Sequence, residues 1–144
     1  MKKIIISSCL ILFTIFSVNA QKWLTDIEEA KNIASKKNQN IILVFEGSDW
    51  CAPCIKLERN IFNTSEFKTY VKKHFTLLKA DFPRKKKNKL ESSQQKKNNL
   101  LMEKYNKHGY FPYVAVINKY GKLLGSTGYK KMNPSEYINL LSSF

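Results

Sequence analysis

The chain has 144 residues, a length that accommodates one compact domain and little else. Hydrophobic residues make up 43% of it, which excludes an intrinsically disordered protein, because such chains hold too few apolar residues to build a core. The formal net charge is +14, and such a balance permits contact with nucleic acid, anionic membranes or acidic proteins. The lysine-rich stretches lack interleaved aromatic residues and a glycine-rich phosphate cradle. We therefore expect a solvated basic face rather than a binding patch, and no nucleic-acid partner.

Residues 1–20 are typical of a secretory signal peptide. Two lysines are followed by an apolar run over 4–16 and by the small residues Val18-Asn19-Ala20, a cleavage site ahead of Gln21. The apolar run is shorter than a bilayer span, which needs about 20 residues, and this favours a cleaved leader over an uncleaved anchor. The sequence thus predicts an exported protein, periplasmic or secreted, whose mature domain covers 21–144 and is not stably inserted in a membrane.

Removal of this leader leaves two cysteines, Cys51 and Cys54. The third, Cys9, stands at the front of the apolar run, whereas a lipid-attachment cysteine follows it, so we do not expect a lipoprotein. Structural disulfides usually close longer loops, so redox chemistry explains a lone Cys-x-x-Cys pair in an exported domain better than an inert local disulfide does. Half of a zinc site is the other alternative. His74 and His108 are not spaced like zinc ligands, and we expect neither metal nor cofactor.

Apolar periodicity and capping residues outline the elements of the first half. The apolar block over 41–45 lacks alternation, as a strand buried on both faces should. The predicted elements are, in chain order, a helix from a Thr25–Glu28 capping box to Lys37, a strand over 41–45, a helix from Cys51 to Phe62, a helix from Asn63 to His74 and a strand over 75–80.

The composition changes after Pro83, where residues 84–97 are polar and lysine-rich. We interpret them as an exposed insertion. The elements predicted beyond it are a helix from Gln94 that packs through Leu100, Leu101 and Tyr105 and is closed by Gly109, two strands over 113–117 and 122–126 around the turn Asn118–Gly121, and a last helix from an Asn133 cap to Ser142. This order predicts an α/β protein with helices on both faces of a mixed sheet of about four strands, the first two strands being parallel.

The motif Trp50-Cys51-Ala52-Pro53-Cys54 directly follows the apolar strand and opens a helix. Unpaired backbone N–H groups and the helix dipole at such a start stabilise a thiolate on Cys51. Cys54 lies one turn further into the helix, where it can resolve a mixed disulfide but is poorly placed to start one.

This motif resembles the active site of the thioredoxin family, and Gly47-Ser48-Asp49-Trp50-Cys51 is similar to exported bacterial thioredoxin-like proteins. Phe111-Pro112, ahead of the terminal hairpin, resembles the family's second mark, a proline with a cis peptide bond. The resemblance covers roughly residues 22–144. It implies the thioredoxin-like fold and thiol–disulfide exchange, with Cys51 as nucleophile, Cys54 as resolving cysteine and a cis Phe111–Pro112 bond.

The resemblance also implies a substrate groove and its residues. The backbone of Phe111 would pair with an extended substrate segment, Trp50 would flank the thiol as an apolar wall, and Pro112 would keep metal from the site. The residues expected to line the groove are Trp50, Ala52, Pro53, Phe111 and Pro112.

Two departures from the family pattern bear on chemistry. Thioredoxins carry a buried Asp six positions before the first cysteine, where this chain has Phe45, so Glu46 and Lys79 are the candidates for proton handling. Ala52-Pro53 stands between the cysteines, and a proline before the second cysteine resembles the reducing members. We therefore expect a reductase of exported proteins that draws on an unidentified electron donor. A disulfide isomerase and a non-catalytic thioredoxin-like binding module are the alternatives.

Overall fold

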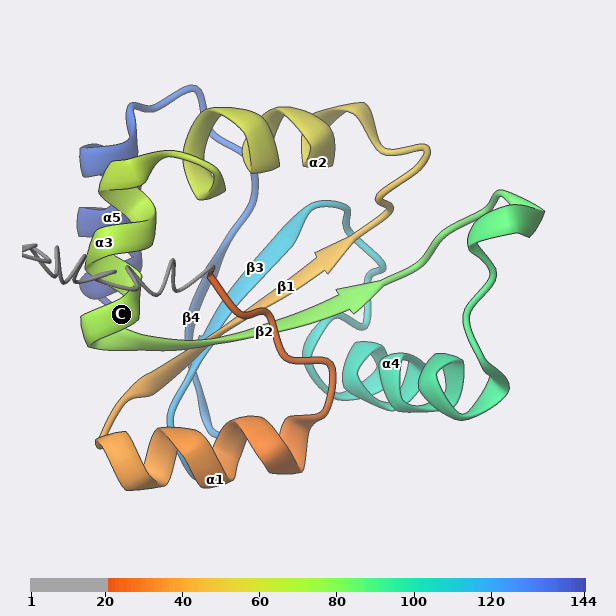
Figure 1. The fold of residues 1–144 in the computed structure, drawn as a ribbon, viewed down its shortest axis with the longest axis horizontal. Helices are drawn as coiled ribbons and strands as arrows, with labels where there is room; N and C mark the ends of the chain where they lie inside the picture. The colour runs from red at the N-terminus through yellow and green to blue at the C-terminus, as the bar shows by residue number, and fades with distance from the viewer. Residues whose placement is uncertain (1–20) are drawn as a thin grey trace, which may run out of the picture.

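The computed structural model describes residues 21–144, and the predicted leader, Cys9 included, lies outside the described residues. Four strands form one mixed sheet in the order β2-β1-β3-β4 (Figure 1). β1 and β2 are parallel, and β3 is antiparallel to both of its neighbours. The strands are β1 (Asn40–Glu46), β2 (Phe75–Asp81), β3 (Tyr113–Ile117) and β4 (Leu123–Thr127). The predicted α/β class and the parallel first pair are confirmed.

Helices cover both faces of this sheet (Figure 1). They are α1 (Ile27–Lys37), α2 (Ala52–Leu57), a π-helical turn η1 (Glu58–Phe62), α3 (Ser65–His74), a 3₁₀ turn η2 (Lys86–Asn88), α4 (Ser92–Tyr105) and α5 (Pro134–Ser142). None of the helices within residues 21–144 is long and apolar enough to cross a membrane.

Strand β1 supplies side chains to two hydrophobic cores. Ile42 and Val44 pack against α2, η1, α3 and α5, while Ile41, Leu43 and Phe45 pack against α1 and α4. Successive side chains of a strand point to opposite faces, so a strand covered on both sides needs the unbroken apolar run seen in the sequence. The same alternation directs Glu46, the last residue of β1, toward the α2 side.

Two of the predicted helix caps are wrong by one residue. The N-cap of α1 is Asp26, whose carboxylate accepts from two first-turn N–H groups, and not Thr25. The N-cap of α3 is Thr64 and not Asn63. In both places adjacent residues can cap a helix, and the tertiary path of the chain decides which one keeps an extended backbone. The capping box at Asn133 is confirmed.

Helix α4 differs most from its prediction. It begins at Ser92, inside the predicted insertion 84–97, and it ends at Tyr105 rather than at Gly109. Leu100, expected on its packed face, is 56% exposed. Its place is taken by Asn98, which is buried and donates to the Asp81 carbonyl at 2.8 Å. A buried polar residue breaks the apolar pattern, which is why the sequence misplaces the inward face.

Candidate active site

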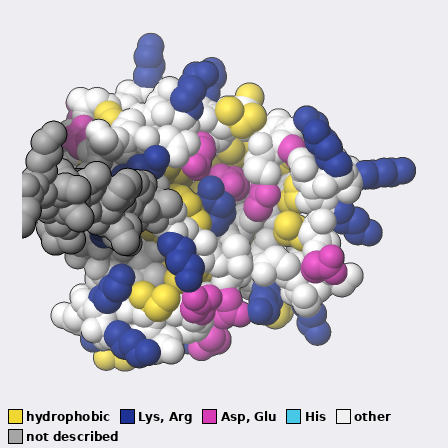
Figure 2. Space-filling view, viewed as in Figure 1, with side chains coloured by type: hydrophobic (Ala, Val, Ile, Leu, Met, Phe, Trp, Pro, Cys, Tyr) yellow, Lys and Arg dark blue, Asp and Glu magenta, His cyan; other side chains and the backbone are white. Residues whose placement is uncertain are grey.

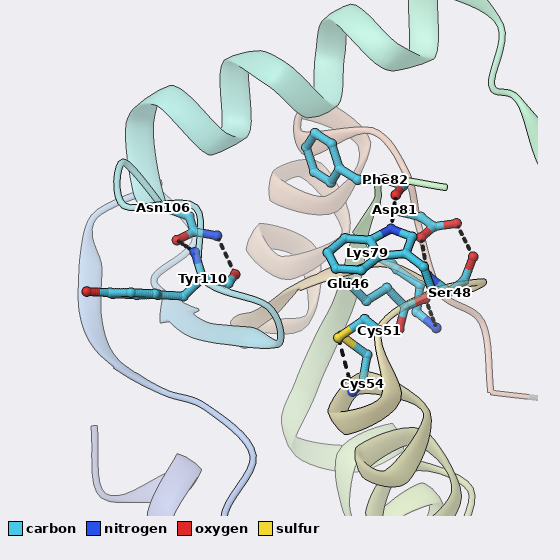
Figure 3. Close-up of a disulfide and its surroundings, with 10 residues drawn as sticks. Glu46, Ser48, Cys51, Cys54, Lys79, Asp81, Phe82, Asn106 and Tyr110 are labelled. Carbon is cyan, nitrogen blue, oxygen red and sulfur yellow. Dashed lines mark hydrogen bonds and ion pairs between the residues drawn. A yellow bond between two sulfur atoms is a disulfide. The ribbon is translucent and has the colours of Figure 1, made fainter. Parts of the chain in front are cut away.

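Cys51 and Cys54 form a disulfide at the start of α2, beyond the end of the central strand (Figure 3). Cys51 is the N-cap of this helix, and its Sγ accepts a hydrogen bond from the backbone N–H of Cys54 at 3.3 Å. A backbone N–H directed at Sγ stabilises a thiolate there once the disulfide is reduced.

The two cysteines are equally buried in this oxidised form, at 3% exposure each. Exposure therefore does not distinguish the predicted nucleophile from the predicted resolving cysteine in the disulfide state. The cysteines differ instead in their surroundings, because Cys54, and not Cys51, lines a pocket of about 480 Å³ that also contains Glu46, Glu58 and Lys79.

An acid–base cluster occupies this pocket beside the disulfide (Figure 3). Lys79 Nζ lies 3.2 Å from a carboxylate oxygen of Glu46 and 3.3 Å from one of Glu58. The side chain of Glu46 is 9% exposed and that of Lys79 19%. Burial raises the pKa of Glu46, while the charge of Lys79 and its hydrogen bond oppose that rise. The structure thus brings together the two residues proposed for proton handling.

Glu58 is the member of this cluster that sequence reasoning missed. It stands four residues after Cys54, and residues four apart lie on the same face of a helix. This spacing could have pointed to it. Phe45, by contrast, is buried on the opposite face of the sheet against Tyr113, at 5.9 Å between ring centroids. The acid that faces the cysteines is therefore five positions before Cys51 instead of six.

The loop between β1 and α2 is shaped around Trp50. The indole N–H donates to the Phe82 carbonyl at 2.7 Å. Its ring packs directly on Gly47, where a Cβ would overlap the indole atoms. Gly47 is thus required for space, a role that no sequence pattern indicates.

Two aspartates fasten this loop to the chain that follows β2. Asp81 accepts from the backbone N–H of Ser48 at 2.9 Å and from its hydroxyl at 2.6 Å. Asp49 accepts from the backbone N–H groups of Arg84 and Lys85 at 2.9 and 3.0 Å and from the Asn88 amide at 2.9 Å. These bonds, the one from the Arg84 N–H foremost, lower the pKa of Asp49.

Across the site, the Phe111–Pro112 peptide bond is cis, as predicted. Phe111 meets the edge of Trp50 with ring centroids 5.4 Å apart. Asn106, which is buried, holds the preceding loop through two hydrogen bonds with the backbone of Tyr110, at 2.9 and 3.0 Å.

The residues expected to line the substrate groove come from two segments, 50–53 and 111–112. Trp50 and Phe111 are in contact, and Ala52 and Pro53 are exposed in the first turn of α2. The Arg84 guanidinium covers the indole of Trp50, the expected apolar wall, 3.6 Å from a ring centroid. Sequence reasoning placed Arg84 in a solvated insertion and missed this contact.

Neither histidine is near a metal-binding cluster. His74 stacks on Tyr70 and His108 on Tyr110, with ring centroids 4.2 and 5.5 Å apart. Within residues 21–144, no three His, Cys, Asp or Glu side chains are grouped closely enough to hold a metal ion.

Comparison with known proteins agrees with the fold and with the chemistry of the site. Residues 22–119 match a family model described as thioredoxin-like. The disulfide bond reductase DsbH of Chlamydia pneumoniae is 34% identical over 115 residues, which cover 80% of this chain and 68% of that protein. A solved structure of DsbH oxidoreductase superposes with a TM-score of 0.78 at 33% identity, covering 85% of this chain and 82% of that one.

A disulphide isomerase from Xylella fastidiosa Temecula1 superposes with a TM-score of 0.61 at 20% identity, covering 81% of this chain and 86% of that one. At this identity the likeness concerns the fold alone. The family match spans well over half of the chain and includes both cysteines and the cis proline. The chain therefore belongs to the thioredoxin-like family and is a thiol–disulfide oxidoreductase.

Proposed function

We propose that this protein reduces disulfides in exported proteins, with Cys51 as the nucleophile and Cys54 as the resolving cysteine. The observation that carries these roles is the asymmetry of the pair. The sulfur of Cys51 accepts a backbone N–H at the helix start, whereas Cys54 faces the acid–base pocket. The relative DsbH is named a disulfide bond reductase, which supports the direction of electron flow.

The reaction then has two exchange steps. The thiolate of reduced Cys51 attacks one sulfur of a substrate disulfide, so a mixed disulfide forms and the other substrate sulfur leaves as a thiolate that takes up a proton. Cys54 loses its proton and attacks the Cys51 sulfur, which releases the second substrate thiolate. Two electrons have passed to the substrate and the protein holds the Cys51–Cys54 disulfide, until a dithiol electron donor reduces it again.

We assign the proton of Cys54 to Glu46. This carboxylate lines the same pocket as Cys54, and burial raises its pKa, which makes it a stronger proton acceptor than an exposed carboxylate. Lys79 and Glu58 act as positioning residues, because Lys79 bonds both carboxylates and balances their charge. Glu46 stands one position later in the sequence than the buried Asp of thioredoxins, and it lines the same pocket as the resolving cysteine, Cys54.

Export is the setting we propose for this chemistry. Cleavage after Ala20, at the end of the small residues Val18-Asn19-Ala20, would leave a mature domain of residues 21–144. N-terminal sequencing of the exported protein tests this, with Gln21 as the expected first residue. Recovery of the 4–16 segment in the exported protein would overturn it.

The cysteine roles are tested by trapping. Cys54→Ser should accumulate mixed disulfides with substrate proteins on Cys51, visible on non-reducing gels, because the resolving thiol is absent. Cys51→Ser is the matched control and should trap few. Equal trapping by both variants would contradict the assignment, and activity in the Cys51→Ser protein would contradict catalysis by the pair.

Equilibration with glutathione buffers tests the direction of electron flow. Ala52-Pro53 adds no side-chain donor or positive charge beside Cys51, so we expect a potential nearer to about −270 mV, the thioredoxin value, than to about −120 mV, the value of a strong oxidant. A value near −180 mV would favour an isomerase, and one above about −150 mV would rule out the reductase.

A further inference from the structure

A strongly basic rim stands beside the active site. We use this name for Arg84, Lys85, Lys86, Lys87 and Lys89, five of the six residues from 84 to 89. All five residues are exposed, and within residues 21–144 none of them forms a salt bridge. They belong to the segment that projects at the right of Figure 1, where dark blue side chains extend outward in Figure 2.

The basic rim is held in place rather than loosely tethered. Asp49 binds the backbone of its first two residues and the side chain of Asn88, which ends the 3₁₀ turn η2. Arg84 lies on the indole of Trp50, the residue next to Cys51. Three hydrogen bonds and one stacking contact thus fix a group of positive charges to the loop that presents the nucleophile.

Within residues 21–144, four lysines outside the basic rim form salt bridges with carboxylates. Lys31 meets Glu28, Lys79 meets Glu46, Lys97 meets Asp26, and the fourth, Lys22, meets Glu29. In the basic rim, the carboxylate of Asp49 is engaged by backbone N–H groups, and the charged side chains are exposed without a salt bridge to any of the described residues. Like charges held together repel one another, so this arrangement adds nothing to stability and is suited to a negatively charged partner.

Resting on the proposed function, we propose that the basic rim recruits protein substrates whose disulfide is flanked by an acidic segment. Salt screens charges beyond about 8 Å at physiological ionic strength, so the acidic residues must lie close to the substrate cysteine. Charges at the edge of an interface act mainly on the association rate and on its salt dependence.

A protein substrate fits this surface better than nucleic acid does. The basic rim is fixed to the Trp50–Cys51 loop, so its occupant is carried to the thiol itself. Single-stranded nucleic acid needs aromatic faces on which bases can stack. Here Trp50 carries Arg84 on its ring, and Phe111 packs against both Trp50 and Phe82.

The test compares three peptides that share one disulfide and differ in whether Glu, Gln or Lys residues flank it. For the reduced wild-type protein at low ionic strength, we expect the second-order rate constant for the acidic peptide to exceed that for the neutral peptide by about tenfold, and salt to remove the excess. The fourfold variant Lys85→Gln, Lys86→Gln, Lys87→Gln and Lys89→Gln should lose this preference and keep the rate with the neutral peptide.

A matched control removes the same charge elsewhere. Lys36→Gln, Lys37→Gln, Lys72→Gln and Lys73→Gln alter the ends of α1 and α3, which lead into the starts of β1 and β2, away from Cys51. This control should retain the preference for the acidic peptide. Circular dichroism of both variants establishes that they are folded before rates are compared.

The outcomes are separable. If the fourfold variant still reduces the acidic peptide faster than the neutral one, the proposal is overturned. The proposal is also overturned if the variant loses rate equally with the neutral peptide, because the segment would then be part of the catalytic structure. Binding to phosphatidylserine vesicles that only the fourfold variant loses, without any peptide preference in the wild type, would assign the basic rim to a membrane surface instead. Failure of the wild type to reduce any of the peptides would contradict the proposed function rather than the basic rim.

Discussion

Two groups of charged residues flank the cysteine pair, and they are built in opposite ways. Lys79 lies in the pocket beside Cys54 and is bonded to Glu46 and Glu58, with less than a fifth of its side chain exposed. The basic rim is exposed to solvent, and within residues 21–144 none of its side chains forms a salt bridge.

The two groups differ in the free-energy cost of holding a charge. A buried cation loses its hydration, and this desolvation costs free energy. Carboxylate partners offset that cost, because charges attract one another more strongly where the dielectric constant is low. An exposed lysine keeps its water and tolerates like-charged neighbours within a few tenths of a kcal/mol. The buried cluster is therefore suited to moving a proton over a short path, and the basic rim to attracting a partner from solution.

The largest expected effect separates the two groups through stability. Lys79→Met should destabilise the oxidised protein by about 3 kcal/mol at pH 8, because it leaves the buried Glu46 without its counter-charge. Lys85→Met, the matched change in the basic rim, should cost less than about 0.5 kcal/mol. Urea unfolding followed by circular dichroism measures both. Equal losses in the free energy of unfolding would mean that the burial of Lys79 does not make it more important to stability than the exposed Lys85.

The same variant has a pH dependence of known sign. Burial raises the pKa of Glu46, and removal of Lys79 raises it further. The folded protein then binds more protons than the unfolded chain above the ordinary carboxyl value of 4.5, so its stability falls as pH rises through the window up to the raised pKa. The loss in Lys79→Met should accordingly be smaller at pH 5 than at pH 8. A loss that grows toward low pH would contradict a raised pKa of Glu46.

Gly47→Ala tests the loop that lies between the two groups. The new methyl group overlaps the indole of Trp50, so the ring and its hydrogen bond to Phe82 must shift. We expect a destabilisation of about 2 kcal/mol and a drop in reductase activity of about tenfold. Gly125→Ala is the steric control, because its methyl group overlaps Phe144, away from the site. That control should lose stability but keep its activity.

Glu46→Gln isolates the proton step. The amide has the shape of the carboxylate and cannot accept the proton of Cys54, so resolution of a mixed disulfide should slow by about tenfold, or about 1.4 kcal/mol. Rapid quenching of the mixed disulfide measures this step directly. Glu58→Gln leaves Glu46 bonded to Lys79 and should slow it by less than about twofold. If Glu58→Gln slowed resolution more than Glu46→Gln does, Glu58 would be the group that takes the proton of Cys54, and Glu46 the positioning residue.

The smallest effect concerns the anchor of the basic rim. Asp49→Ala removes the acceptor of two backbone N–H groups, so trypsin should cleave between 84 and 89 several-fold faster. Asp26→Ala, which removes a similar acceptor at α1, should leave cleavage there unchanged. The pKa of Asp49 is lowered, so its anchoring is present at neutral pH and is lost as pH falls through that lowered value.

The fold follows from local patterns to a large extent. The unbroken apolar run of β1 predicts a strand covered on both faces, and the cap at Asn133 predicts the start of α5. The errors occur where the sequence offers two equivalent choices, as at Thr25 and Asp26, or where a polar residue is buried, as at Asn98. In each of these places a distant contact decides, and single-sequence patterns do not contain it.

The sequence by itself determined the reactive pair, its place at a helix start and the cis proline opposite, because these depend on short motifs and their order. Only the tertiary structure decided what surrounds the pair. Glu58 joins Glu46 and Lys79 through the packing of α2 and η1 on the sheet, Gly47 makes room for Trp50, and Arg84 returns to cover that ring. These contacts join residues from separate segments, and their energies depend on burial and distance, which the chain acquires only when it folds.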